Sequence, residues 1–180
     1  MSLMSSSASC VLAALALLAS GAAPVRAEEP FQRPDFTGSW ELDLDASERV
    51  GTLLKALGRS WLEQRAADSV RVTQHILQTE ETVTITIDTS LRDSREVLTL
   101  DGAPRSLTTE KGHVVSSRTY WEGDSVLVTE TDAVLASGKR GSFRILRSLI
   151  DGGQTLLQRL ELQVPGAERI VANRILRRAG

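Results

Sequence analysis

Two arginines are the side chains of this sequence best suited to binding chemistry, because each shares a predicted strand face with apolar residues. Arg147 lies in an alternating segment at residues 141–150, and Arg174 lies in another at residues 168–178. The apolar residues on their faces are Phe143, Ile145 and Leu149 for the first and Ile170, Ala172 and Leu176 for the second. A guanidinium on an apolar face needs a partner, since burying an unpaired charge is costly. A carboxylate held by the guanidinium groups is one such partner.

Two other arrangements of these arginines are open at the level of sequence. The alternation could be inverted, so that both arginines face solvent, because Val171 and Ile175 occupy the opposite face of the last segment. The arginines could also pair with Glu130 or Asp132 inside the protein. A ligand anion, solvent and an internal acid are therefore the three partners to be distinguished.

The remaining side chains give no catalytic or metal-binding pattern. His75 and His113 are the only histidines, and they fall in separate predicted strands. His, Asp and Glu do not occur at metal-ligand spacing, and no Gly-x-Ser-x-Gly nucleophile motif is present. Cys10, the only cysteine, precedes an apolar run near the N-terminus and cannot form a disulfide framework. We therefore expect no catalytic residue, no metal and no cofactor, although acid–base pairs assembled by folding are invisible here.

The segments that must position the arginines are predicted to be a series of short strands. Segments of period-two alternation are separated by turn signals such as Asp101-Gly102. The predicted strands are residues 36–44, 70–78, 82–88, 95–100, 105–110, 113–120, 125–135, 141–150, 155–164 and 168–178. Because no crossover helix separates them, the sheet should be antiparallel, and it loses its edges most simply by closing. We expect an all-β, up-and-down barrel of about ten strands.

Two short helices are predicted directly after the first strand. Val50, Leu53, Leu54 and Leu57 recur at i, i+3, i+4 and i+7, which is one stripe of a helix. This stripe must be buried, and the open end of a barrel offers a place for it. We therefore expect a helix–turn–helix cap over the mouth of the barrel.

The boundaries of the two helices follow from capping residues. Asp45 or Ser47 is a candidate cap for the first helix, and Asp45-x-x-Glu48 has the form of a capping box. Gly58 is expected to end this helix, because glycine accepts the left-handed conformation that follows a helix. Ser60-x-x-Glu63, a second capping box, is expected to open the second helix.

The order of these elements resembles a known family. Phe36-x-Gly38-x-Trp40-x-Leu42 and the helix pair after it are similar to the opening of the fatty-acid-binding proteins and, more loosely, of the lipocalins. Arg147-Ser-Leu-Ile-Asp-Gly152 resembles their Arg-Glu-Leu-x-Asp-Gly segment, and Arg174-Ile-Leu176 resembles their terminal Arg-x-Tyr. The resemblance implies that Arg147 and Arg174 point into the cavity and hold a fatty acid carboxylate. Leu176 stands where the family has tyrosine, so one contact to that carboxylate is missing.

Other side chains complete the predicted site. Leu54 and Leu57 on the first helix are expected to line the ligand cavity from the cap. Trp61 on the second helix either lines the portal or anchors the lid. Trp40 is expected to be structural and to pack at the closed end of the barrel.

Residues 1–27 are predicted to be a signal peptide. Residues 11–19 form an unbroken apolar run that is too short to span a bilayer, and Val25-Arg26-Ala27 has the form of a cleavage site. Residues 28–34 then read as an extended leader, and residues 35–180 read as a single barrel domain. We expect an exported protein, periplasmic or secreted, with no integral membrane segment in the mature chain.

The composition narrows the range of partners. The chain has 180 residues and a formal net charge of −2, which gives no reason to expect nucleic acid as a partner. Three functions fit a monomeric capped barrel: a carrier of a small hydrophobic or amphipathic ligand such as a fatty acid, a filled barrel that serves as a structural or interaction module of the cell envelope, and an enzyme acting on a small lipophile. Small or polar inward candidates (Ser116, Gln158, Ala172) favour an open interior and hence the carrier.

Overall fold

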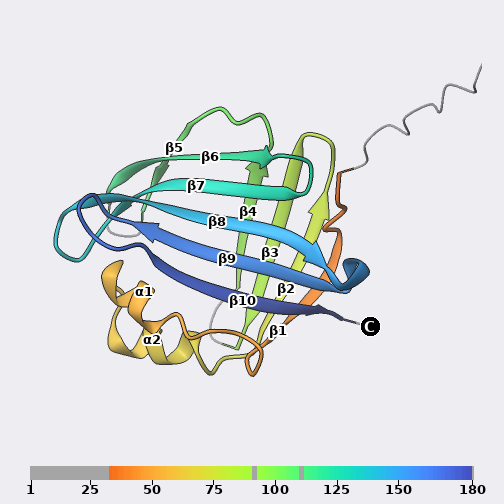
Figure 1. Ribbon diagram of the computed structural model, residues 1–180, viewed down its shortest axis with the longest axis horizontal. Helices are drawn as coiled ribbons and strands as arrows, with labels where there is room; N and C mark the ends of the chain where they lie inside the picture. Colours follow the sequence, from red (N-terminus) through yellow and green to blue (C-terminus); the bar gives the residue numbers. More distant parts are fainter. Residues whose placement is uncertain (1–32, 91–92, 110–111, 180) are drawn as a thin grey trace, which may run out of the picture. The chain divides into compact units, whose positions relative to one another are not determined.

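The computed structural model describes residues 33–90, 93–109 and 112–179 (Figure 1). Its strands form one antiparallel sheet in the order β4-β3-β2-β1-β10-β9-β8-β7-β6-β5, with two helices between β1 and β2. The elements are β1 (Gly38–Asp43), α1 (Gly51–Ala56), α2 (Trp61–Ala67), β2 (Val72–Gln78), β3 (Thr82–Thr89), β4 (Ser94–Thr99), β5 (Arg105–Thr108), β6 (Val114–Glu122), β7 (Val126–Val134), β8 (Arg140–Ile150), the 3₁₀ turn η1 (Asp151–Gly153), β9 (Thr155–Gln163) and β10 (Ile170–Arg178). The predicted ten-stranded up-and-down topology and the helix pair after the first strand are confirmed. The predicted signal peptide lies outside the described residues.

The sheet curls upon itself, but its two edge strands do not pair with each other (Figure 1). β4 lies close to β6 across this seam. The backbone N–H of Gly102, in the connection between β4 and β5, donates to the carbonyl oxygen of Thr119 on β6 (3.0 Å). The β4–β5 connection therefore bridges this seam, and the sheet is a curled one whose two edge strands do not pair.

One apolar cluster fills the part of the barrel around Trp40. Trp40 is fully buried, and its indole Nε1 donates to the carbonyl oxygen of Phe36 (2.9 Å). The ring of Phe36 stacks on Trp121, with their centroids 5.9 Å apart. The other buried members are Ile76, Val83, Ile85, Leu98, Leu127, Leu156 and Leu176. Trp40 thus has the packing role that the sequence predicted, and this part of the interior is occupied by the protein's own side chains.

A second apolar cluster lies under the helix α1. Leu53 is 1% exposed and packs against Ala133, Leu135 and Leu162 at the ends of β7 and β9. Val50 is also buried, so the predicted apolar stripe of the first helix faces the inside of the barrel. The stripe is buried at the barrel mouth, as a cap requires.

The predicted caps of α1 are wrong. The N-cap is Val50, and it makes no side-chain hydrogen bond to the helix. The β1 ladder ends at Asp43, opposite Ile175, which leaves the next N–H groups of β10 without a strand partner. Ser47 Oγ accepts from the N–H of Ile175 (2.9 Å), and a carboxylate oxygen of Glu48 accepts from the N–H of Asn173 (2.8 Å). Ser47 and Glu48 therefore accept hydrogen bonds from backbone N–H groups of β10 and do not cap α1, because leaving a backbone N–H unpaired is costly.

The predicted boundary between the helices is confirmed. Gly58 follows the C-cap of α1 with φ +74°, which a residue with a side chain adopts at a cost. Ser60 is the N-cap of α2, and its Oγ accepts from the N–H of Glu63 (3.3 Å). The carboxylate of Glu63 accepts in return from the N–H of Ser60 (2.7 Å), which completes the capping box.

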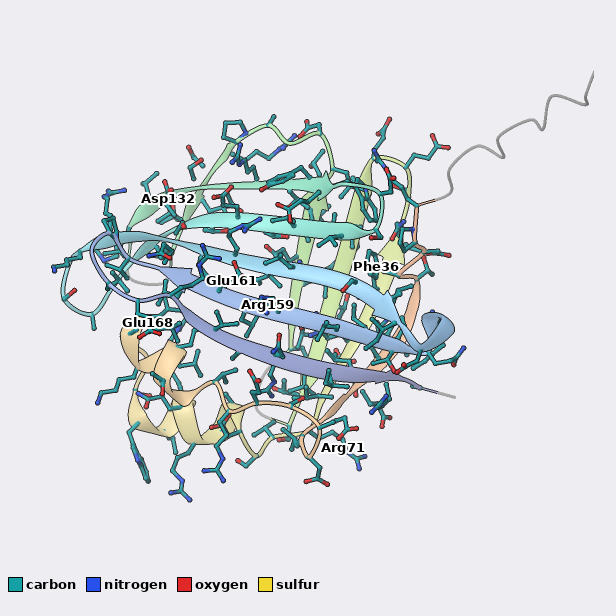
Figure 2. All side chains as sticks on the ribbon, in the orientation of Figure 1. Phe36, Arg71, Asp132, Arg159, Glu161 and Glu168 are labelled. Atoms are coloured by element: carbon teal, nitrogen blue, oxygen red, sulfur yellow. The ribbon has the colours of Figure 1, made fainter. Side chains whose placement is uncertain are left out.

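The outer wall is held by ion pairs. Glu161 on β9 is 5% exposed, although its side chain lies on the outer face of the sheet next to Arg159 (Figure 2). Its carboxylate lies 2.7 Å from Arg159 Nε, 3.2 Å from Arg169 Nη1 and 3.5 Å from Arg144 Nη1. Three guanidinium groups therefore cover this carboxylate and tie β8, β9 and the turn before β10 together.

Candidate functional site

Three polar side chains form a row across the inner wall of the barrel. Gln158 on β9 lies opposite Arg147 of β8 on one side and opposite Arg174 of β10 on the other. Arg147 is 4% exposed, Gln158 7% and Arg174 8%. Because neighbouring strands lie about 4.8 Å apart, the two arginine backbones are separated by about 10 Å. The solvent-facing alternative for the arginines is therefore wrong.

Arg147 is a buried cation with few partners. Its Nη1 donates to Thr129 Oγ1 (3.0 Å), whereas its Nε is buried and has no hydrogen-bond partner. Within the part of the chain that the structure describes, no carboxylate lies within 4.0 Å of its guanidinium nitrogens. Burial lowers the pKa of Arg147 to about 10, and the negative charge of Glu96 raises it in part. Such a group gains strongly from an anion that can reach it.

The internal acids considered from sequence do not serve as partners. Glu130 pairs with Arg118 on the outer wall, with 2.6 Å between Oε2 and Nη2. Asp132 is exposed, and its carboxylate accepts from the backbone N–H of Ser116 (3.4 Å). The alternation of strand residues places both acids on the face opposite to Arg147.

Arg174 differs from Arg147 because it is bound to the end of α2. Its Nη2 donates to the carbonyl oxygen of Ala67 (3.0 Å), and its Nη1 lies 3.6 Å from Asp68 Oδ1. Burial lowers the pKa of Arg174, and the charge of Asp68 raises it in part. The two arginines look equivalent in the sequence, but among the described residues only Arg174 has a carboxylate within 4.0 Å.

An apolar cavity of about 350 Å³ separates the lid from the polar row. Its size is that of a small-molecule site. The apolar lining consists of Leu42, Val50, Leu53, Leu54, Leu57, Ala67, Val72, Phe143 and Leu160. Leu54 and Leu57 line the cavity on its lid side.

The polar end of this cavity is made by two glutamines and Arg174. Gln158 Nε2 donates to Gln74 Oε1 (2.8 Å), and Gln74 Nε2 donates to Gln158 Oε1 (3.3 Å). This reciprocal pair joins β9 to β2 across the barrel and, with Arg174, lines the cavity. Gln158 is also the strand neighbour of Arg147, so the two backbones lie about 5 Å apart, although Arg147 itself does not line this cavity.

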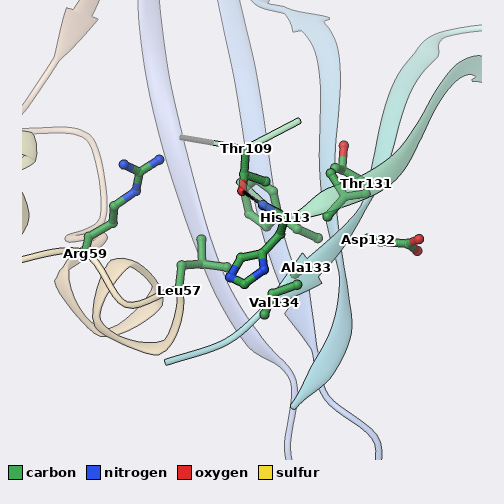
Figure 3. Close-up of a pocket in the computed structure, with 10 residues that line it drawn as sticks. Leu57, Arg59, Thr109, His113, Thr131, Asp132, Ala133 and Val134 are labelled. Carbon is green, nitrogen blue, oxygen red and sulfur yellow. Dashed lines mark hydrogen bonds between the residues drawn. The ribbon is translucent and has the colours of Figure 1, made fainter. Parts of the chain in front are cut away.

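A second cavity of about 270 Å³ adjoins the first at the edge of the lid. Leu57, Arg59 and Phe143 line both cavities, so the two are neighbours. Figure 3 shows the imidazole of His113 beside Leu57 and Val134, with Arg59 across the opening. No role was predicted for His113 from sequence, because its place beside Leu57 depends on how the turn between β5 and β6 meets the helix pair.

Two predicted ligand-binding residues lie elsewhere. Trp61 is 67% exposed, lines neither cavity, and its ring faces the guanidinium of Arg65 at 5.2 Å. The expectation that Trp61 lines the portal or anchors the lid is wrong, because α2 turns this side chain toward solvent. Leu176 is fully buried in the cluster around Trp40 and does not line the 350 Å³ cavity. It contributes to the packed part of the interior.

The structure also brings together three side chains that no sequence motif connected. His75 Nδ1 lies 2.8 Å from Ser39 Oγ, and its Nε2 lies 3.0 Å from Asp88 Oδ2. The group is half-exposed on the outer wall of β1, β2 and β3, and none of its members lines a cavity described above. We do not include this group in the candidate site. Among the described residues, no cluster of three or more His, Cys, Asp or Glu side chains could hold a metal ion, and no helix is long and apolar enough to cross a membrane.

Several solved structures share this fold. The REP1-NXSQ fatty acid transporter superposes with a TM-score of 0.61 at 20% sequence identity, covering 80% of this chain and 96% of that one. Lipid binding protein 8 of Caenorhabditis elegans, without ligand, gives a TM-score of 0.64 at 17% identity over 80% and 95% of the two chains. A fatty acid binding protein of Schistosoma mansoni, in complex with arachidonic acid, gives 0.60 at 19% identity over 81% and 96%.

No protein-family model matches the sequence, and no curated protein matches it. Identities of this size establish the fold alone. The order of the strands, the helix pair after β1 and the coverage of nearly the whole of each neighbour agree. The chain has the β-barrel fold of the fatty-acid-binding and lipid-binding proteins.

Proposed function

We propose that this protein binds and carries a small amphipathic acid, such as a fatty acid, inside the capped barrel. The hydrocarbon chain occupies the 350 Å³ cavity under the lid, and the carboxylate lies at its polar end. Leu54, Leu57 and Phe143 contact the chain, while Gln158 and Arg174 form the polar end, with Arg147 beside Gln158 on the neighbouring strand. The fold neighbours named above, a fatty acid transporter and two lipid-binding proteins, support a binding role over an enzymatic one.

The observation that carries this proposal is the buried guanidinium of Arg147, which has one hydrogen bond and, among the described residues, no carboxylate within 4.0 Å. A buried charge with one hydrogen bond destabilises the empty protein, and a ligand carboxylate removes that penalty. A fully packed structural barrel gains nothing from such a group. Arg147 is the strand neighbour of Gln158, which lines a cavity otherwise made mainly of leucine, valine and phenylalanine, and this favours a ligand with an apolar chain and one acidic end.

The expected affinity follows from the two ends of the ligand. Each methylene buried in the cavity contributes about 0.8 kcal/mol. A charge-assisted hydrogen bond to the carboxylate adds about 1.5–3 kcal/mol, or about one to two decades in affinity. An acid should therefore bind more tightly than the alcohol of the same chain length.

Titration calorimetry on delipidated protein tests the proposal with dodecanoic acid and dodecanol. Wild type should prefer the acid, and Arg147→Met should weaken the acid about tenfold to a hundredfold while leaving the alcohol nearly unchanged. Arg140→Met is the matched control, because Arg140 lies on the same strand but is exposed. Equal losses for acid and alcohol in Arg147→Met would show that the carboxylate does not lie at this arginine.

The second candidate function is a structural or interaction barrel of the cell envelope. The packed cluster around Trp40, which fills part of the interior, is the observation that favours it. The same titration separates the two functions, since a filled barrel binds neither ligand.

We further propose that the protein acts as an exported monomer after removal of residues 1–27, on the pattern of its N-terminal sequence.

A further inference from the structure

We propose that the contact between Asp68 and Arg174 is a latch that holds α2 closed, and that the carboxylate of a bound ligand competes with Asp68 for Arg174. This inference rests on the proposed function, because it requires an anion in the cavity. It assigns the two arginines different tasks. Arg147 supplies a buried positive charge that has no carboxylate within 4.0 Å among the described residues. Arg174 couples ligand binding to the position of α2, because it contacts the end of that helix.

The latch joins three elements through one carboxylate. Asp68 is the C-cap of α2. Its Oδ1 accepts from the backbone N–H of Val50 at the start of α1 (3.0 Å) and lies 3.6 Å from Arg174 Nη1 on β10. Arg174 Nη2 also donates to the carbonyl oxygen of Ala67, the last residue of α2 (3.0 Å). Removal of Arg174 from this group would release the end of α2 from the barrel wall.

The two helices are anchored very differently. In α1, Leu53 is 1% exposed, and the carbonyl oxygen of Ala56 accepts from the N–H of Ala136 beyond β7 (3.0 Å). In α2, no residue is buried, and Trp61 and Leu62 are 67% and 69% exposed. A segment with so little buried area opens at low free-energy cost. The Arg174 contacts are therefore a large part of what fixes α2 to the barrel.

Arg174 can be approached from two sides. On one side it lines the apolar cavity together with Gln158. On the other side it lines a polar cleft of about 420 Å³ together with Asp68 and the segment from Leu44 to Arg49. Asp68 contacts it from the cleft, whereas a ligand carboxylate would reach it from the cavity. A carboxylate at hydrogen-bonding distance competes well with an ion pair at 3.6 Å, because charge-assisted bonds of about 2.8 Å are the stronger ones.

The competition has a thermodynamic consequence. Since coupling between two equilibria is reciprocal, a ligand that weakens the latch must bind more tightly when the latch is already broken. Asp68→Asn removes the charge but keeps an oxygen that can accept from Val50. The latch therefore predicts that Asp68→Asn increases the affinity for an acid by about threefold to tenfold, whereas a purely structural Asp68 predicts a decrease.

Hydrogen exchange of the α2 amides tests the latch directly in wild type. Dodecanol fills the cavity but has no charge, so it shows the effect of packing against the lid. Dodecanoic acid should give α2 amides that exchange about tenfold faster than with dodecanol at saturating ligand, while α1 amides exchange equally with both. This comparison requires no mutation and so does not depend on the folding of a variant.

The same hydrogen-exchange measurement on the Asp68→Asn variant is a second test of the latch. Asp45→Asn is the control variant, because Asp45 lines the same cleft. In Asp68→Asn, α2 amides should exchange faster in the empty protein and should no longer distinguish acid from alcohol. Asp45→Asn should behave as wild type. If the acid binds but α2 exchanges equally with acid and alcohol in wild type, the latch is wrong and the proposed function stands. If no acid binds, the proposed function fails and the latch fails with it.

Discussion

Replacing Arg147 with methionine should stabilise the empty protein while it weakens binding of an acid. Burial lowers the pKa of Arg147 well below its ordinary value, to about 10. This difference corresponds to about 3 kcal/mol, which is the penalty for keeping the group charged in the folded state. Methionine keeps much of the side-chain length without the charge. Loss of the hydrogen bond to Thr129 costs about 1 kcal/mol, so a net gain of about 1–2 kcal/mol in the free energy of unfolding is expected.

Urea unfolding of delipidated wild type and Arg147→Met measures this gain. The midpoint should rise with little change in the m-value, because the area exposed on unfolding stays similar. For a domain of this size, the melting temperature should rise by about 2–8 °C. A fall in stability would refute the reasoning, since it would show that Arg147 is already compensated in the empty protein. Arg140→Met should leave stability nearly unchanged.

The pH dependence of the stability difference between Arg147→Met and wild type tests whether the buried charge causes it. The folded-state pKa of Arg147 lies below its unfolded value, so the unfolded state binds more protons between about pH 10 and the ordinary pKa of arginine. Wild-type stability therefore carries the full penalty below pH 10 and loses it as the pH rises through this window. The advantage of Arg147→Met should be constant near neutral pH and should shrink above pH 10. An advantage that stays constant at high pH would point to packing as its cause.

Three further predictions follow from the packing and the N-terminal sequence. Leu53→Ala should lower the free energy of unfolding by about 2–5 kcal/mol in urea, because Leu53 is the buried anchor of α1; a loss below 1 kcal/mol would mean that the lid is not packed as described. Gly141→Ala should cost about 1–3 kcal/mol in the same assay, because a Cβ at this position meets the carbonyl oxygen of Gln163, and an unchanged midpoint would contradict that contact. The exported protein should begin at or near Glu28 by intact mass, and retention of residues 1–27 would rule out the signal peptide.

Local patterns in the sequence predicted most of the fold. Period-two alternation with regular turn signals was sufficient for the ten strands, and the capping box of Ser60 and Glu63 depends on residues three positions apart. The direction of Arg147 and Arg174 also followed from alternation along single strands. These features could be predicted because each depends on neighbours in the chain.

Features that depend on distant contacts could not be predicted. Ser47 and Glu48 have the residue types of helix caps, but β10 uses them because the β1 ladder ends early. The pairing of Arg174 with Asp68 depends on where α2 ends above the barrel, and alternation carries no information about it. The exposure of Trp61 depends on the orientation of α2, whose few apolar residues define no clear stripe.

The most direct test of the central claim is a pH titration of the ligand carboxylate. The titration is monitored by NMR of carboxyl-¹³C dodecanoic acid bound to wild type and to Arg147→Met. A carboxylate beside a buried guanidinium should have a pKa about 1–3 units below that of the same acid bound to the variant. The wild-type resonance should therefore remain that of the ionised form at pH values where the variant-bound acid is protonated. Identical titration curves in the two proteins would contradict the account, because they would place the carboxylate away from Arg147.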